Sequence, residues 1–280
     1  MRDRLGEKPL YYGWQGQGAA RALLFGSELK ALQAHPAFCA RIDRAALGQF
    51  MRHNYIGAPW SIYEGIYKLP PGCLVRLSLA RPDAQPVPYW RVADVVQALR
   101  TDPFAGSADE AVDELERLLK QAIARQMVAD VPLGAFLSGG VDSSTVVALM
   151  QAQSSRPVRT FTIGSDAPGY NEAVHAKSVA AHLRTDHTEL YVSAQDALNV
   201  IPRLPEIYCE PFADSSQIPT FLVSQLARRH VAVALSGDGA DELLGGYNRY
   251  QVTAVAWQRL QRVPASVRGV AASALQSVSP

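Results

Sequence analysis

The chain has little cysteine for its 280 residues. Its three cysteines, Cys39, Cys73 and Cys209, are widely spaced and odd in number. Such a set is typical neither of a disulfide framework nor of a zinc site, and it favours a reducing, cytoplasmic setting. The six histidines are scattered too, so the sequence predicts no metal centre of the cysteine and histidine type.

An excess of charge of one sign is also absent. Lysine and arginine total 27 against 26 aspartate and glutamate residues, which leaves a formal net charge of +1. This balance argues against nucleic acid as the main partner, although local groups can still hold a small anion. No apolar run approaches the roughly 18 residues of a membrane span, and the first residues lack the apolar core of a secretory signal. We therefore expect no membrane partner.

Apolar residues are plentiful at 48%, which is enough for a sizeable core, and the length suggests about two domains. Residues 1–91 contain short apolar runs separated by turns. Within them, apolar spacing predicts helices over 27–34, with Ser27 as the N-cap, and over 43–53. Breaker residues over 92–108 predict a linker.

A different pattern begins after the linker. A long amphipathic helix is expected first, and from Val131 onward short apolar runs alternate with helical spacing. The predicted strands are 131–137, 158–163, 187–191 and 231–235. The predicted helices are 143–153, 171–183, 194–201 and 219–229. This alternation predicts an α/β domain with a parallel sheet covered on both faces, in which ligands bind beyond the carboxyl ends of the strands.

The first loop with a chemical signature is 137–144, which reads LSGGVDSS. Its glycines allow a tight turn, and the free N–H groups at the start of the following helix favour an anion. Asp142 would repel a bare phosphate, so its presence suggests a Mg²⁺ ion between them. No lysine follows the glycines, which excludes a Walker A loop. A simple Ser-Gly turn capped by Asp142 is the alternative reading.

The second such loop is 235–247, which reads LSGDGADELLGGY. Its three carboxylates repel one another unless a cation or a cationic substrate neutralises them, and a solvated acidic turn is the alternative. Ser138 and Ser236 are 98 residues apart, which is about three strand–helix steps at roughly 30 residues each. We therefore expect both loops at one edge of the sheet, forming a nucleotide–Mg²⁺ site.

These residues resemble a known family. SGGVDSS resembles the pyrophosphate-binding loop of ATP pyrophosphatases, and SGDGADELLGGY resembles the signature of glutamine-dependent asparagine synthetases. RDRLGEKPLYY, FGSELKAL and IYEGIYKLPPG are similar to the later part of that family's glutaminase domain. The resemblance implies a partial α+β glutaminase domain over 1–91, a linker over 92–108, and a parallel-sheet, adenine nucleotide α-hydrolase-like domain over 109–280.

In this family a carboxylate attacks the α-phosphate of ATP, and ammonia then displaces AMP from the acyl-adenylate to form an amide. The resemblance implies that Asp142 and Asp241 bind Mg²⁺ and that Asp238 lies close to the acyl-adenylate and the amine. The implied nucleotide-binding residues are six of the first loop together with three others: Leu137, Ser138, Gly139, Gly140, Asp142, Ser143, Ile163, Ser236 and Gly237. Of these, the backbone around Leu137 and Ile163 would contact adenine.

The sequence also departs from the family pattern. The family's cysteine nucleophile and later catalytic lysine have no counterpart between Met1 and Pro280. We therefore expect two incomplete domains and no glutamine hydrolysis by this chain. Part of the acceptor pocket is expected over 210–216, where the Thr and Arg pair of some members is missing, so the acceptor is aspartate or another carboxylate. The nitrogen donor is ammonia or glutamine.

Three alternatives stay open on sequence alone. A cyclase or amidotransferase of the same family, acting on another carboxylate, shares both halves of the pattern. NAD or GMP synthetases and tRNA thiolases are related ATP pyrophosphatases, but they fit the motifs and the cysteine content less well. A non-catalytic remnant that binds Mg·ATP is the third alternative, and a homodimer is one expected form of assembly.

Overall fold

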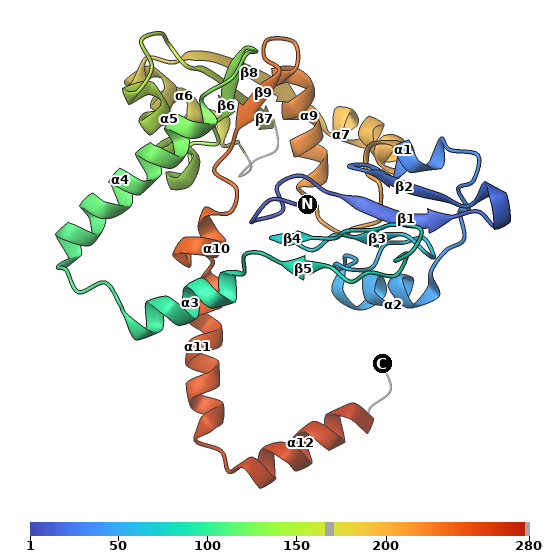
Figure 1. The fold of residues 1–280 in the computed structure, drawn as a ribbon. Helices are drawn as coiled ribbons and strands as arrows, with labels where there is room; N and C mark the ends of the chain where they lie inside the picture. The colour runs from blue at the N-terminus through green and yellow to red at the C-terminus, as the bar shows by residue number, and fades with distance from the viewer. Residues whose placement is uncertain (166–170, 278–280) are drawn as a thin grey trace. The chain divides into compact units, whose positions relative to one another are not determined.

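The computed structural model describes residues 1–165 and 171–277 (Figure 1). The chain divides into two compact units. The first contains Met1–Leu115 and Ser193–Leu222, and the second contains Glu116–Val192 and Val223–Pro280. Within the described ranges, no helix has both the length and the apolarity needed to cross a membrane.

The first unit contains two small antiparallel sheets. One has the strand order β2-β1-β3 and the other pairs β4 with β5. Their bounds are β1 Tyr11–Gln15, β2 Ala22–Gly26, β3 Tyr67–Lys68, β4 Cys73–Leu74 and β5 Val87–Pro88, with a short 3-10 turn, η1 Gly18–Ala20, between β1 and β2. Alternate residues of β1 are buried, as expected for a sheet with one face on a core. That core contains Tyr11, Leu24, Leu29, Leu32, Ala46, Ile56, Ile62 and Ile66.

The helices before residue 103 agree only partly with the predictions. Helix α1, Leu29–Gln33, has Glu28 at its N-cap, so the predicted cap at Ser27 is wrong. The helix predicted over 43–53 is confirmed as α2, Arg44–His53. The Asp43 carboxylate caps this helix by accepting hydrogen bonds from two backbone amides of its first turn. Helix α3, Val92–Thr101, lies inside the predicted linker and was not anticipated, although none of its residues is buried.

The first unit also takes in a segment far along the chain. Its elements are α7 Ala194–Val200, the 3-10 turn η2 Ile201–Arg203, α8 Leu204–Ile207 and the beginning of α9 Gln217–Ala227. A capping box formed by Ser193 and Asp196 starts α7. Cys209 packs against the core of the first unit.

The second unit is built on a four-stranded sheet with the order β8-β7-β6-β9. All neighbouring strands are parallel. The strands are β6 Leu133–Phe136, β7 Arg159–Ser165, β8 Asp186–Val192 and β9 Val233–Leu235, and they match the four predicted strands within a few residues. This confirms the predicted α/β class with a parallel sheet.

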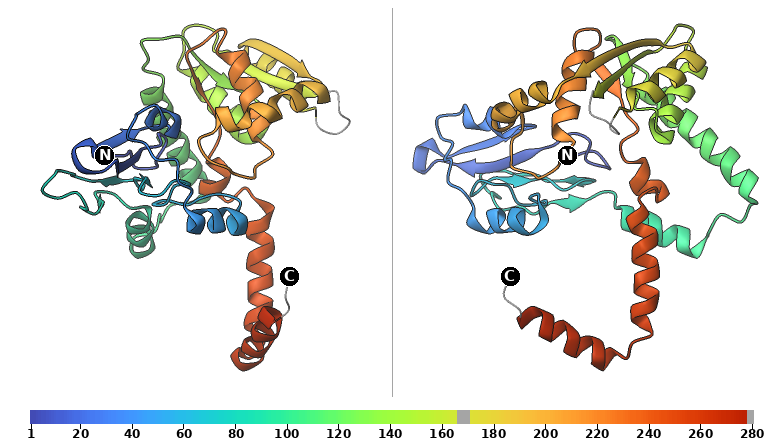
Figure 2. Two further views of the ribbon diagram at one scale, coloured as in Figure 1. Left: turned by 90° about the vertical axis from the view of Figure 1, so that its right-hand side faces the viewer. Right: turned by 180° about the vertical axis from the view of Figure 1, so that it is seen from behind.

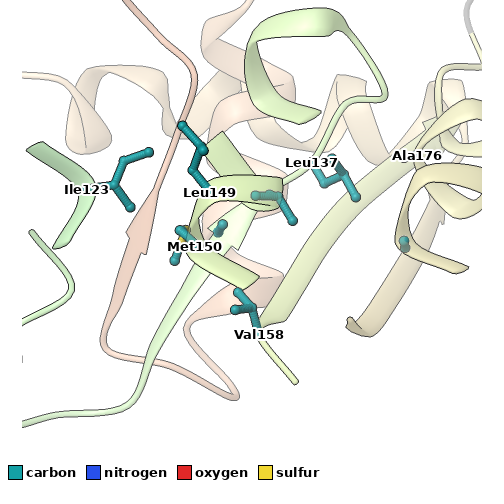
Figure 3. Close-up of a cluster of buried hydrophobic side chains, with 9 residues drawn as sticks. Ile123, Leu137, Leu149, Met150, Val158 and Ala176 are labelled. Atoms are coloured by element: carbon teal, nitrogen blue, oxygen red, sulfur yellow. The ribbon is translucent and has the colours of Figure 1, made fainter. Parts of the chain in front are cut away.

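Helices cover both faces of this sheet. The helices are α4 Ala108–Gln126, α5 Val141–Ala152 and α6 Ala173–Leu183, besides α9. Ala135 and Leu137 contact one core, which side chains of α4, α5 and α6 complete (Figure 3). Phe136, between them in sequence, packs with α9 on the other face. This alternation is the reason that the strand reads as a continuous apolar run.

Three helices follow β9: α10 Ala240–Leu244, α11 Asn248–Gln261 and α12 Ala265–Ser277. Helices α11 and α12 extend away from the four-stranded sheet of their own unit in the views of Figures 1 and 2. No residue of α11 is buried.

Candidate functional site

Strands β6 and β9 are neighbours in the sheet although β7 and β8 lie between them in sequence. The registers pair Gly134 with Ala234 and Ala135 with Leu235. Because the strands are parallel, the loops that follow them leave from the same edge. The strand order also reverses direction at this point, and ligands of α/β sheets bind at such a switch point. The prediction that the two motif loops share an edge is confirmed.

The first loop is closed by its own hydroxyl groups. The Oγ atoms of Ser138 and Ser143 are 2.9 Å apart. The Ser138 backbone amide donates to Ser143 Oγ over 3.2 Å, and the Gly140 amide donates to Ser138 Oγ over 3.2 Å. These bonds hold both side chains at the start of α5.

Gly139 has a conformation and an environment that only glycine accepts. Its φ is +81°, and a Cβ there would lie 2.6 Å from the Ala176 nitrogen and 2.7 Å from the Cβ of His175. The first turn of α6 therefore forms the wall behind the loop. Nothing in the sequence pattern around His175 and Ala176 indicated this contact.

The N-terminus of α5 is open to a ligand. The helix begins after Gly140 without a side-chain cap, so the first amides of the helix have no partner within it. In the same turn, Ser144 Oγ is buried and has no hydrogen-bond partner among the described residues. Buried polar groups normally have a partner, and the dipole at a helix N-terminus favours an anion. This turn therefore has the donors that a phosphate would use.

The two motif loops touch at Gly237. A Cβ on Gly237 would lie 2.8 Å from the Ser143 backbone nitrogen and 3.0 Å from the Asp142 carbonyl carbon. The backbone of the second loop thus lies directly on the first turn of α5, at a distance that excludes a side chain.

The carboxylates of the second loop differ in their surroundings. Asp238 accepts a hydrogen bond from Ser236 Oγ over 3.0 Å. Glu242 is exposed and accepts from the Tyr247 hydroxyl over 2.8 Å, a hydrogen bond that lowers the pKa of Glu242. Asp241 lies in the first turn of α10, with Gly246 against its side chain. Asp238 and Glu242 therefore each accept a hydrogen bond from a hydroxyl group of their own loop.

These acidic groups do not form a metal site by themselves. Among the residues with described positions, no group of three or more histidine, cysteine, aspartate or glutamate side chains is arranged to hold a metal ion. A cation here would need ligands from a bound molecule or from water. Such a mixed set is usual for Mg²⁺, which binds one or two carboxylates together with phosphate oxygens.

The two positions predicted near adenine lie in or directly after adjacent strands. Leu137 directly follows β6, is 1% exposed, and donates its amide to the Phe161 carbonyl of β7 over 3.0 Å. Ile163 lies toward the carboxyl end of β7, paired with Leu190 and half-buried. Both positions are therefore near the sheet edge where the motif loops begin.

Comparison with known proteins identifies two family models. The asparagine synthase model matches residues 114–279. The glutamine amidotransferase domain model matches residues 1–90. The candidate site described above lies within the asparagine synthase match.

Curated proteins similar to the chain have related names. A Methanocaldococcus jannaschii protein, provisionally named glutamine-hydrolyzing asparagine synthetase 2, is 36% identical over 249 residues, covering 88% of this chain and 46% of that protein. Glutamine-hydrolyzing asparagine synthetase 1 of Bacillus subtilis is 32% identical over 270 residues, covering 95% and 40%. The chain thus spans less than half the length of these relatives.

Similarity to solved structures is weaker. An NH₃-dependent NAD synthetase from Campylobacter jejuni is 16% identical with a TM-score of 0.35, over 49% of this chain and 60% of that one. That likeness is too distant to carry a conclusion, whereas the asparagine synthase model covers more than half of the sequence. The chain belongs to the asparagine synthase family.

Proposed function

We propose that the chain is part of an ATP-dependent amide ligase of the asparagine synthase type. It would activate aspartate, or another carboxylate, with ATP as an acyl-adenylate, which releases pyrophosphate. Nitrogen from ammonia or glutamine would then displace AMP to form the amide. The observation that supports this most is the contact of Gly237 with Ser143. This contact brings the loop with phosphate-binding donors next to the loop with carboxylates, and neither loop contains a Walker lysine.

The first loop would bind the pyrophosphate part of ATP. Ser138, Gly139, Gly140 and Ser143 surround the uncapped start of α5, where amide and hydroxyl donors meet the positive end of the helix dipole. The buried Ser144 hydroxyl, without a partner among the described residues, adds a donor in the same turn. Donors fixed in this way would stabilise charge as it develops on the leaving pyrophosphate.

The residues present fit Mg²⁺ as a companion of the phosphates. Asp142 lies in the first turn of α5 and Asp241 in the first turn of α10. Each carboxylate would provide one oxygen ligand, and ATP and water would complete the set. When bound, Mg²⁺ would neutralise phosphate charge and orient the leaving group.

The remaining predicted residues would bind the rest of the nucleotide and the reacting groups. Backbone atoms around Leu137 and Ile163 would contact adenine, and Ser236 and Gly237 would lie near the adenosine. Asp238 is exposed, and Ser236 holds its carboxylate. It would act close to the acyl-adenylate and the incoming amine, where a carboxylate can accept a proton from nitrogen.

The proposed domain boundaries correspond to the two family matches. Residues 1–91 would be the later part of a glutaminase domain, 92–108 a connection and 109–280 the front of the synthetase domain. The matches over 1–90 and 114–279 support this division. The nitrogen for the amide would be delivered from the glutaminase side or taken up as free ammonia.

Calorimetric titration with Mg·ATP tests the proposal. We expect the chain to bind Mg·ATP, and Ser143→Ala and Asp142→Ala each to weaken binding by about tenfold or more, since hydrogen bonds to charged groups contribute about 1.5–3 kcal/mol. Ser178→Ala is a matched control, because the Ser178 hydroxyl is exposed and donates to the Val174 carbonyl within α6. If both site variants bind as the parent chain does, the assignment of the loop is wrong.

A further inference from the structure

Residues 193–222 lie inside the asparagine synthase match but belong by contact to the first compact unit. The residues matched by the amidotransferase model therefore form one body with a piece of the synthase sequence. The stretch between α8 and α9, residues 208–216, contains no helix or strand. A stretch of this kind takes its position from contacts with its surroundings.

Glu210 makes one of these contacts, and its carboxylate is nearly buried. Its carboxylate forms an ion pair with Lys68, and the two side chains are 9% and 17% exposed. Its other oxygen, Oε1, accepts from the Ile62 backbone amide over 2.8 Å. The Tyr11 hydroxyl donates to Oε2 over 3.4 Å. Both oxygens of this nearly buried carboxylate are thus satisfied by residues 11–68.

The Lys68 ammonium group also has partners besides Glu210. This group donates to the Ile56 carbonyl over 2.6 Å and lies 5.9 Å from the centre of the Tyr11 ring. Burial, together with the Glu210 carboxylate, raises the pKa of Tyr11, so this hydroxyl remains a donor. Loss of one partner of such a pair leaves a buried charge without compensation, which costs more than the pair contributes.

Two further hydrogen bonds hold the chain on either side of Glu210. The Leu29 amide donates to Cys209 Sγ over 3.1 Å, and the Ala213 amide donates to the Asn54 carbonyl over 2.8 Å. The nearly buried Glu210 is therefore flanked by hydrogen bonds at residues 209 and 213.

We propose that Glu210 is a positioning residue that, through Lys68 and the Ile62 amide, fixes residues 211–216 on the amidotransferase-matched part of the chain. The resemblance described above puts these residues in the acceptor pocket, so the identity of the ligand rests on the proposed function. The contact itself does not. The amidotransferase part would then serve the ligase as a scaffold for its acceptor segment as well as in nitrogen supply.

Four variants of the whole chain test this role: Glu210→Gln, Lys68→Met, the double variant, and Glu206→Gln as a matched control. Glu206 is exposed and lies only four residues away in the same segment. Hydrogen exchange of the Ile62 and Ala213 amides reports on the contact. We expect each single variant to accelerate both about tenfold, the double variant to be no faster than the faster single variant, and Glu206→Gln to stay within twofold.

Ligand titration separates positioning from general loosening. We expect Glu210→Gln and Lys68→Met to weaken L-aspartate binding at least fivefold while Mg·ATP affinity stays within twofold. Unchanged exchange at Ile62 and Ala213 in both single variants, or equal weakening of aspartate and Mg·ATP, would overturn the positioning role. If the parent chain does not bind aspartate, the proposed acceptor is wrong, and the exchange data alone decide whether Glu210 fixes the segment.

Discussion

Gly237 lies so close to Ser143 that a Cβ at position 237 would be 2.8 Å from the Ser143 backbone nitrogen. The two residues come from loops that follow adjacent parallel strands, β6 and β9. One loop has hydroxyl and amide donors, and the other has carboxylates. Their contact makes the two sequence motifs parts of a single site.

Gly237→Ala is expected to push the second loop away from α5. The added methyl group overlaps backbone atoms of Asp142 and Ser143, which cannot move as a flexible side chain would. We expect Mg·ATP binding to weaken at least tenfold and the free energy of unfolding to fall by about 1–3 kcal/mol, the usual range for an overpacked site. Titration and denaturant unfolding measure the two effects.

Gly48→Ala is the control for this substitution. Gly48 lies within helix α2, where a Cβ meets no atom within 4 Å. Alanine there should raise the free energy of unfolding by about 0.5–1 kcal/mol, because glycine is a poor helix former. Equal Mg·ATP affinity in the Gly237→Ala and Gly48→Ala variants would show that the loop contact has no part in binding.

His187 should make stability depend on pH. Its Nδ1 lies 2.8 Å from Thr160 Oγ1, and its buried Nε2 has no hydrogen-bond partner among the described residues. Burial lowers the pKa of His187, an effect that Glu189 opposes and Lys177 reinforces. His187 therefore takes up a proton near pH 6.5 in the unfolded chain, whereas in the folded chain it takes up that proton only at a lower pH. The free energy of unfolding should fall as the pH drops from about 7 to 5.

Denaturant unfolding at several pH values checks this dependence. A single proton contributes a slope of at most about 1.4 kcal/mol per pH unit. We expect His187→Gln to reduce the slope between pH 5 and 7, whereas His182→Gln, at an exposed position, should leave it as it is. An unaltered slope in His187→Gln would mean that another group titrates in this range.

Met150→Ala should be among the costly core substitutions. Met150 is 1% exposed and lies in the cluster between α5 and the sheet, seen in Figure 3. The loss of buried methylene groups and the cavity left behind are expected to lower the free energy of unfolding by about 2–5 kcal/mol. Val174→Ala, at a 55% exposed position on α6, should change it by less than about 0.5 kcal/mol. Similar values for the two variants would contradict the burial of this cluster.

Much of the second unit was predictable because its signals are local. Buried parallel strands read as short apolar runs, and the helices between them show their own periodicity, so all four strands were found. The shared edge of the motif loops followed from the spacing of Ser138 and Ser236. The direct contact of Gly237 with α5 did not, since nothing in a sequence specifies a backbone distance.

The features that were missed depend on distant partners. Glu210 and Lys68 are far apart in sequence, and neither stands in a pattern that points to the other. The place of residues 193–222 in the first unit is equally invisible along the chain, because the family match assigns them to the synthase portion. The local preference of serine for N-cap positions favoured Ser27, whereas the observed N-cap is the next residue, Glu28. At α3, breakers near residue 102 obscured a real helical spacing.

Hydrogen exchange with and without Mg·ATP tests most directly whether the two loops form one site. We predict that Mg·ATP slows amide exchange in 138–144 and in 236–242 together, with the same dependence on nucleotide concentration. Protection of only one loop, or of neither at concentrations where the nucleotide binds, would contradict a shared nucleotide site at the edge formed by β6 and β9.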